Sequence, residues 1–210
     1  MARRRPAPRD TKERILDAAL VEFGAKGFRS ASIDDIASRA GVTKGAIYYY
    51  FVDKDDLARD LHALIWERLK AEAMEAFDVS GDTVRNLNRC FDSYLTALAR
   101  LGDARFFLRD SYALPALEDA AREQREGAYT LIKALLDEGV ARADIVELDT
   151  GAMARVLVGA YNEATMHILE TGEARPTLEV IRRVVAAFAR TDAARSAGAP
   201  TRQAVKARTA

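Results

Sequence analysis

A lysine, a glycine and two tyrosines in one short segment are spaced for contact with a polyanion. At about 100° per residue, a helix over residues 44–51 turns Ile47 and Phe51 to one side, with Tyr50 at the border. The opposite side carries Lys44, Gly45, Tyr48 and Tyr49. A basic and aromatic helix face, with a glycine that permits close approach, has the side chains that contact base edges and phosphates in a DNA major groove.

The residues before this segment predict how it is positioned. Ser32 and Asp35 have the spacing of a capping box, and one apolar helical stripe follows, formed by Ile33, Ile36, Ala37 and Ala40. Gly41 allows the left-handed backbone of a tight corner, and Thr43 is a good N-cap for the next helix. This pattern predicts two helices joined by a sharp turn. Two interpretations of that shape are open: a DNA-binding unit, or an ordinary helix pair whose tyrosines pack in a core.

Three separated blocks resemble the TetR family, the tetracycline-repressor-like transcriptional regulators. They are the segments from Ile15 to Phe28, from Ser32 to Ala37 and from Gly41 to Leu57. The resemblance covers roughly residues 11–60 and preserves the order and spacing of the blocks, although Val52 stands where the family commonly has proline. Beyond these blocks the chain is similar to the family only in length and helical pattern.

The resemblance implies roles for individual residues. Thr43, Lys44, Gly45 and Tyr48 would contact bases and nearby phosphates, and Tyr49 and Tyr50 would touch the DNA backbone. Lys54 would bind a phosphate at the start of a long fourth helix, where the helix N-terminus also attracts anions. The predicted DNA-binding set is Ser32, Thr43, Lys44, Gly45, Tyr48, Tyr49, Tyr50 and Lys54. The phase of Tyr50 also allows it to pack inward.

Composition predicts an all-α fold. The chain of 210 residues is 49% hydrophobic, and its 5 prolines and 12 glycines punctuate long periodic segments. The 32 basic and 32 acidic residues balance overall, but residues 1–54 carry 11 Lys/Arg against 7 Asp/Glu, a net charge of +4, which leaves −4 for residues 55–210. A mildly basic head on an acidic body suits a protein that presents one end to DNA, while overall neutrality argues against general coating of nucleic acid.

Helix punctuation divides the chain. We expect a flexible basic arm at 1–10, a three-helix DNA-binding domain with a helix-turn-helix at 11–54, a helical ligand-binding and dimerisation bundle at 55–190, and a disordered tail at 191–210. Helices of the bundle are expected at about 53–77, 83–101, 104–113, 115–138, 150–171 and 177–190, which gives about nine in all. Whether the basic arm contacts DNA or is simply solvated stays open.

Scattered aromatic and polar residues in the middle helices are candidates for a small-molecule site. The candidates are Trp66, Phe91, Tyr94, Phe107, Arg109, Tyr112, Tyr129, Asn162, Glu163 and His167. A mostly apolar pocket with few polar groups is the usual form of such a site. Plain core packing is the alternative for each aromatic residue, and the family resemblance implies that some pocket exists.

The last two helices are apolar around more than one face. Small residues interrupt them at Ala152, Gly159, Ala160 and Ala164. Such surface must be buried by something. The resemblance implies a four-helix bundle with a second subunit, and completion of the monomer core is the alternative.

Little in the sequence supports catalysis. There are 2 histidines and a single Cys90, with no metal-ligand spacing, nucleophile elbow or glycine-rich phosphate loop. We expect no enzyme activity, no cofactor and no metal, and we expect Cys90 to be buried in a cytoplasmic protein. No apolar run approaches the ~20 residues that span a bilayer, and no secretory signal is recognisable.

The predicted function is a ligand-responsive repressor that binds a palindromic DNA operator as a homodimer, through contacts between the last two helices. A small, largely apolar effector would release it. A helical protein-binding adaptor without DNA sequence specificity is the alternative.

Overall fold

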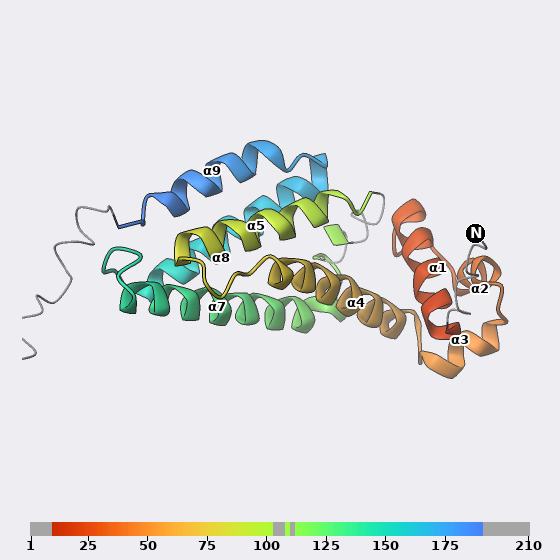
Figure 1. Cartoon of the computed structure of the whole chain (residues 1–210). Helices are drawn as coiled ribbons and strands as arrows, with labels where there is room; N and C mark the ends of the chain where they lie inside the picture. Colours follow the sequence, from red (N-terminus) through yellow and green to blue (C-terminus); the bar gives the residue numbers. More distant parts are fainter. Residues whose placement is uncertain (1–9, 103–107, 110–111, 191–210) are drawn as a thin grey trace, which may run out of the picture.

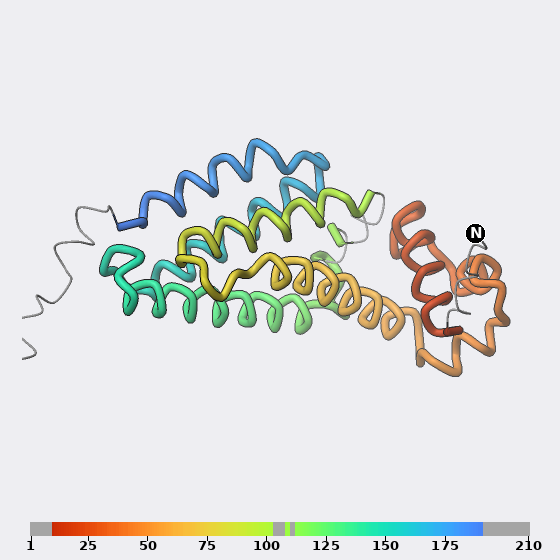
Figure 2. The backbone as a smooth tube through the Cα atoms, viewed as in Figure 1, coloured from red at the N-terminus to blue at the C-terminus, as the bar shows by residue number. Residues whose placement is uncertain are grey.

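The computed structural model describes residues 10–102, 108–109 and 112–190, and its elements are helices (Figure 1). A small head contains α1 (Thr11–Lys26), α2 (Ile33–Ala40) and α3 (Lys44–Tyr50). The long helix α4 (Lys54–Glu75) leaves the head and enters a bundle with α5 (Thr83–Ala99), the 3₁₀ turn η1 (Pro115–Leu117), α7 (Glu118–Ala141), α8 (Thr150–Thr171) and α9 (Arg175–Ala186). The all-α prediction is therefore confirmed. The C-terminal end of α9, in blue, lies at the end of the bundle opposite the head (Figure 2).

Side-chain caps begin the main helices. Ser32, Thr43, Asp53, Asp82 and Asp149 each accept a hydrogen bond from the backbone N–H three residues later. Each cap satisfies one of the N–H groups that a helix start leaves unpaired and contributes about 1 kcal/mol. Gly41 ends α2 at φ 63°, the left-handed conformation that the tight corner before α3 requires.

One hydrophobic core runs from the head into the bundle. In the head, Ile15, Phe23, Ile36 and Ile47 have no exposed surface. Leu57 and Leu61 of α4 belong to the same cluster, which continues through α5, α7 and α8. A buried side chain of this size contributes about 1.5–3 kcal/mol, so apolar packing holds α4 to both the head and the bundle.

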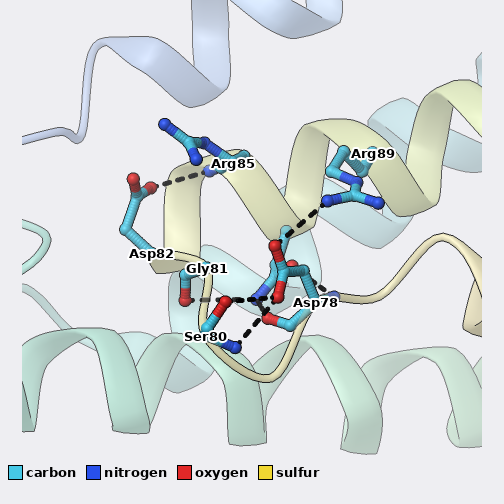
Figure 3. Close-up of polar contacts among 7 residues, drawn as sticks. Asp78, Ser80, Gly81, Asp82, Arg85 and Arg89 are labelled. Atoms are coloured by element: carbon cyan, nitrogen blue, oxygen red, sulfur yellow. Dashed lines mark hydrogen bonds and ion pairs between the residues drawn. The ribbon is translucent and has the colours of Figure 1, made fainter.

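The turn between α4 and α5 is held by its own polar groups (Figure 3). The Asp78 carboxylate accepts hydrogen bonds from the backbone N–H and the hydroxyl of Ser80, at 3.0 and 2.7 Å, and from Arg89 at 3.3 Å. The buried Asn86 amide donates to the Asp78 carbonyl oxygen at 2.9 Å and accepts from the Asp78 N–H. This turn fixes the end of α4 that lies farthest from the head.

Helix α7 extends beyond the expected end near residue 138. Gly139 is buried inside it, and an added Cβ there would lie 2.6–2.8 Å from three side-chain atoms of Thr83 on α5. Gly139 therefore allows α7 to pack closely against α5, and it does not end the helix. After it, Ile145 forms an antiparallel bridge with Ala189, which joins the α7–α8 loop to the segment after α9.

Other helix ends differ slightly from expectation. Helix α9 begins at Arg175, because Pro176 fits the first turn of a helix, and it ends at Ala186. The helix expected over 104–113 lies mostly outside the described residues, as do the arm and the tail. No helix in the described part of the chain has both the length and the apolar character needed to cross a membrane.

Candidate nucleic-acid interface and effector site

Helix α3 presents the face that its sequence predicts. Ile47 and Phe51 are buried against the head, whereas Tyr48 is 49% and Tyr49 82% exposed. Gly45 is exposed, and the atom nearest to an added Cβ is the Thr43 hydroxyl at 3.8 Å. That hydroxyl accepts a hydrogen bond from the Ala46 N–H at 3.2 Å, so Thr43 shapes the start of the helix.

Lys44 stands at the start of this face. Its ammonium group donates to the Asp34 carboxylate at 3.0 Å, and this pair raises the lysine pKa. Both side chains are largely exposed, and an exposed pair contributes little to stability. Lys44 can therefore exchange Asp34 for a phosphate at small cost.

Tyr50 and Ser32 are turned toward the protein. Tyr50 is half-buried against the core, and its ring meets Tyr49 edge-on with centroids 5.1 Å apart. Ser32 Oγ accepts from the Asp35 N–H at 3.1 Å and donates to the Asp35 carboxylate at 2.8 Å. Tyr50 thus supports the exposed Tyr49, and Ser32 caps α2.

Lys54 binds backbone carbonyl oxygens of the head in this structure, whereas the family resemblance implies that it binds a DNA phosphate. Its ammonium group donates to the carbonyl oxygens of Phe28 at 2.9 Å, Ala31 at 3.1 Å and Arg29 at 3.4 Å, and it lies 4.6 Å from the centroid of the Phe28 ring. An ammonium group has three donors, and all three are used within the chain. In this arrangement Lys54 ties the start of α4 to the loop between α1 and α2.

A charged network braces α1 against α2. The carboxylate of Glu22 is nearly buried and accepts from Lys26 at 2.9 Å and from Arg39 at 2.6 Å, and Lys26 also pairs with Asp35 at 3.0 Å. Lys26, followed by Arg39, lowers the pKa of Glu22. Arg14 donates to the carbonyls at the end of α2, including that of Gly41 at 3.1 Å. The spacing of Glu22 and Lys26 is a visible signal, but the links between helices require the fold.

Three of the predicted effector residues meet in the bundle. Trp66 of α4 stacks on Tyr94 of α5 with ring centroids 5.9 Å apart and 12° between planes. Phe91 approaches the same group through Tyr161 of α8, whose ring lies 5.7 Å from Phe91 and 4.6 Å from Tyr94. With His62, these residues form what we call the aromatic cluster.

His62 and Tyr161 were missed from the sequence because a lone residue on an apolar helix face is usually ordinary core. His62 Nε2 accepts a 2.7 Å hydrogen bond from the Trp66 indole N–H. Burial lowers the pKa of His62 to about 4, so the imidazole is neutral at pH 7.

Two buried hydroxyls beside the rings, those of Tyr94 and Thr165, lie close to each other, and the Tyr94 hydroxyl also lies close to that of Tyr161. Among the described residues, Tyr94 Oη and Thr165 Oγ1 have no hydrogen bond of ordinary geometry. Burial raises the pKa values of Tyr94 and Tyr161 well above the usual value for tyrosine. The cluster is therefore uncharged and retains capacity for hydrogen bonding, because a buried hydroxyl without a well-aligned hydrogen bond favours any group that supplies one.

The remaining effector candidates are dispersed. Tyr129 lies under Arg155, with 5.0 Å from its ring centroid to the guanidinium carbon, and its hydroxyl adjoins Gly151 in the first turn of α8, away from the cluster. Glu163 is exposed and lies outside the aromatic cluster, so its place in an effector site stays a prediction. Arg109, Asn162 and His167 are half-buried, Tyr112 is 38% exposed, and Phe107 lies outside the described residues.

An apolar face covers α8 and α9. Val156 is 61% and Val180 60% exposed, and Gly159 and Ala160 lie open beside them. A shallow groove of about 70 Å³ separates the two helices, with Phe91 and Tyr161 of the aromatic cluster among its lining residues. Ala164, expected on this face, is buried inside the subunit, and Cys90 is only half-buried.

Comparison with known proteins decides the family. The family model described as bacterial regulatory proteins, tetR family, matches residues 15–61, and that described as Tetracyclin repressor-like, C-terminal domain, matches residues 84–191, just over half of the chain. The chain belongs to the TetR family. It is a DNA-binding transcription regulator and not an enzyme.

Relatives of this TetR-family chain differ in how much of it they match. The HTH-type transcriptional regulator AcrR of Shigella flexneri is 48% identical over 58 residues, which cover 28% of this chain and only 25% of AcrR. The uncharacterized HTH-type transcriptional regulator YhgD of Bacillus subtilis is 25% identical over 154 residues, 72% of this chain and 81% of YhgD.

Solved TetR-like structures share the fold. A TetR-like regulator from Rhodococcus sp. RHA1 superposes with a TM-score of 0.69 at 22% identity, over 85% of this chain and 96% of that one. FadR from Bacillus subtilis, in complex with stearoyl-CoA, has a TM-score of 0.70 at 20% identity, over 82% of this chain and 94% of FadR.

Proposed function

We propose that this TetR-family regulator is a cytoplasmic repressor that binds a palindromic operator as a homodimer and is released by a small, largely apolar effector. The observation that carries the proposal is the exposed Lys44, Gly45, Tyr48 and Tyr49 surface on a helix fixed by a buried opposite face. We propose that Thr43, Lys44, Gly45 and Tyr48 contact bases and adjacent phosphates and that Tyr49 contacts the backbone. Ser32, Tyr50 and Lys54 support this surface from behind.

DNA flanking the protein's own gene tests the first part. Binding should be selective for one fragment and weaken with salt. Tyr48→Ala should weaken it at least tenfold, and Val79→Ala, at an exposed site on the turn between α4 and α5, should leave it unchanged. If no upstream fragment is bound at low salt, the repressor proposal fails and the protein-binding adaptor becomes the better account.

The apolar α8–α9 face supports a dimer. A second copy of the same face would bury Val156, Val180 and the small residues between them, and a two-fold dimer matches a palindromic operator. Val180→Glu should convert the dimer to monomer in size-exclusion chromatography with light scattering. Val79→Glu adds the same charge on the α4–α5 turn and should leave the dimer intact; equal behaviour of the two variants would contradict the assigned face.

The aromatic cluster supports the effector site. Its neutral rings, and the Tyr94 and Thr165 hydroxyls that have no hydrogen bond of ordinary geometry, favour an uncharged molecule with a flat apolar body and one hydrogen-bonding group. A related structure, FadR, holds stearoyl-CoA, but rings fill the interior here and favour a more compact ligand. A ligand that binds only the folded state must raise Tm, and Tyr94→Phe should reduce that rise for neutral planar compounds.

Helix α4 supplies the connection between the two sites. It carries Trp66 in its middle, Lys54 ties its start to the head, and the Asp78–Asn86 turn holds its other end. A ligand that separates Trp66 from Tyr94 would therefore tilt α4 about its far end, and the start of α4 would move together with the attached head. The two heads of a dimer would then be misspaced for adjacent major grooves, which is a population shift toward a state that does not bind DNA.

A further inference from the structure

A pocket of about 150 Å³ lies between the end of α7 and the turn that joins α4 to α5, the turn drawn in Figure 3. It has about twice the volume of the α8–α9 groove. An engineered protein cavity of about 150 Å³ binds benzene, so the pocket has room for a small organic molecule. The described residues that line it include none of the aromatic cluster, so it is a second candidate site for a ligand.

Part of the lining is apolar, and hydrogen bonds within the chain fix its shape. Phe77 comes from the turn and Leu135 from α7, and both are half-buried. The buried Asn86, in the same lining, donates its two amide N–H groups to the carbonyl oxygens of Asp78 at 2.9 Å and Gly81 at 3.4 Å. The pocket therefore offers a ligand an apolar surface on a turn that is already held in place.

The lining also contains an ion pair, between Glu138 and Arg142. The two residues are one helical turn apart at the end of α7, and their side chains are 48% and 49% exposed. A pair with this exposure contributes little to stability. A guanidinium group has five N–H donors in a fork that fits a carboxylate, and here the Glu138 carboxylate meets one terminal nitrogen, Nη2. Both charged groups can therefore turn to a ligand at small cost.

Two opposite charges in contact favour a ligand that carries both signs. Glu138 repels a carboxylate that has no ammonium group beside it, and Arg142 repels an amine that has no carboxylate. An α-amino acid carries an ammonium group and a carboxylate on the same carbon, so each group can meet the opposite charge at once. A compact apolar side chain on that carbon suits the Phe77 and Leu135 surface and the size of the pocket.

We propose that this pocket binds an α-amino acid with a short apolar side chain, such as valine or leucine. Arg142 binds the carboxylate, Glu138 binds the ammonium group, and Phe77 and Leu135 pack against the side chain. The bound molecule joins α7 to the turn at the far end of α4. The site is separate from the α3 surface and from the aromatic cluster, so this proposal does not depend on DNA binding or on the effector proposed above.

Isothermal titration calorimetry of the full-length protein with L-valine and L-leucine tests the site. A ligand of this size should bind with a Kd on the order of 1 mM, and about 10 mM of it should raise Tm by about 3–6 °C. Isovalerate and isobutylamine, which are valine without its ammonium group and without its carboxylate, should each bind about tenfold more weakly or worse. Binding of either compound as tight as that of valine would refute the amino-acid assignment, and absence of binding by both amino acids would refute the site.

Two substitutions and a matched control locate the binding. Arg142→Gln and Glu138→Gln should each weaken valine binding about tenfold or more, and because the pair is exposed, Tm without ligand should stay within about 2 °C of the wild-type value. Arg122→Gln breaks a similar exposed pair, with Asp119 near the other end of α7, and should leave valine binding unchanged. Wild-type affinity in either pocket variant, or an equal loss in all three variants, overturns the proposal whether or not the protein binds DNA.

Discussion

Two lysines ten residues apart should give opposite results when each is replaced by methionine. Lys54→Met removes the ammonium group that holds the carbonyls of Phe28, Ala31 and Arg29. Lys44→Met removes one that meets only the exposed Asp34. Both changes remove one positive charge near the proposed DNA surface, so a difference between the variants reports on structure and not on charge.

The magnitude for Lys54 follows from its geometry. Its two shorter hydrogen bonds, at 2.9 and 3.1 Å, contribute about 1.5–3 kcal/mol each, as bonds to a charged donor do. The contact with the Phe28 ring adds about 0.5–1 kcal/mol, and ordering the lysine side chain costs up to about 2 kcal/mol. Since water replaces part of the lost bonding in the variant, we expect a net loss of about 2 kcal/mol, or about 4–8 °C in Tm for a chain of this size.

Calorimetry and DNA titrations at several salt concentrations distinguish the two lysines. Lys54→Met should lower Tm and weaken binding to all DNA sequences without changing the salt slope. Lys44→Met should leave Tm nearly unchanged and make the slope shallower by about 0.9 for one lost phosphate contact. A shallower slope with normal Tm for Lys54→Met would refute the structural role and return Lys54 to the DNA interface.

Further predictions concern the body. Gly139→Ala should lower Tm by about 4–8 °C, because the added Cβ would lie within 2.8 Å of Thr83 and overpacking costs about 2 kcal/mol. The control, Gly127→Ala, changes a glycine of the same helix whose added Cβ would have nothing within 4 Å, and it should raise Tm by about 2 °C. A rise in Tm for both variants would contradict the close packing at Gly139. The neutral His62 should add on the order of 3 kcal/mol to the free energy of unfolding above about pH 6.5. This stability should be lost as pH falls toward 4, because the unfolded histidine binds a proton in this range whereas the folded one, with a pKa of about 4, does not. Chemical denaturation at several pH values should show that the free energy of unfolding falls less between pH 6.5 and 5 for His62→Leu than for the wild type.

Local signals were sufficient for most of the fold. Caps at Ser32, Thr43 and Asp53 and the left-handed Gly41 are features of neighbouring residues, so the sequence predicts the helix starts closely. Gly139 shows the limit of such signals. A glycine near a helix end usually terminates it, but here Thr83, more than fifty residues away, needs the space.

The residues of the candidate site likewise fall into those that local sequence predicts and those that depend on distant parts of the chain. The outward side of α3 follows from helical phase alone, which places Tyr48 and Tyr49 correctly. The partners of Lys54 lie in a loop more than twenty residues upstream, and nothing in the local pattern indicates that its ammonium group turns inward. The aromatic cluster likewise depends on three different helices, which is why Tyr161 was not among the candidates and Tyr129 was.

The stacked ring pair in the bundle has an optical consequence. Trp66 is the single tryptophan of the chain, so all indole fluorescence comes from the one residue that contacts both His62 and Tyr94. A compound that entered between the rings would shift the emission spectrum, and protonation of the imidazole would quench it. The protein therefore carries its own spectroscopic probe at the proposed effector site, and ligand screening needs no attached dye.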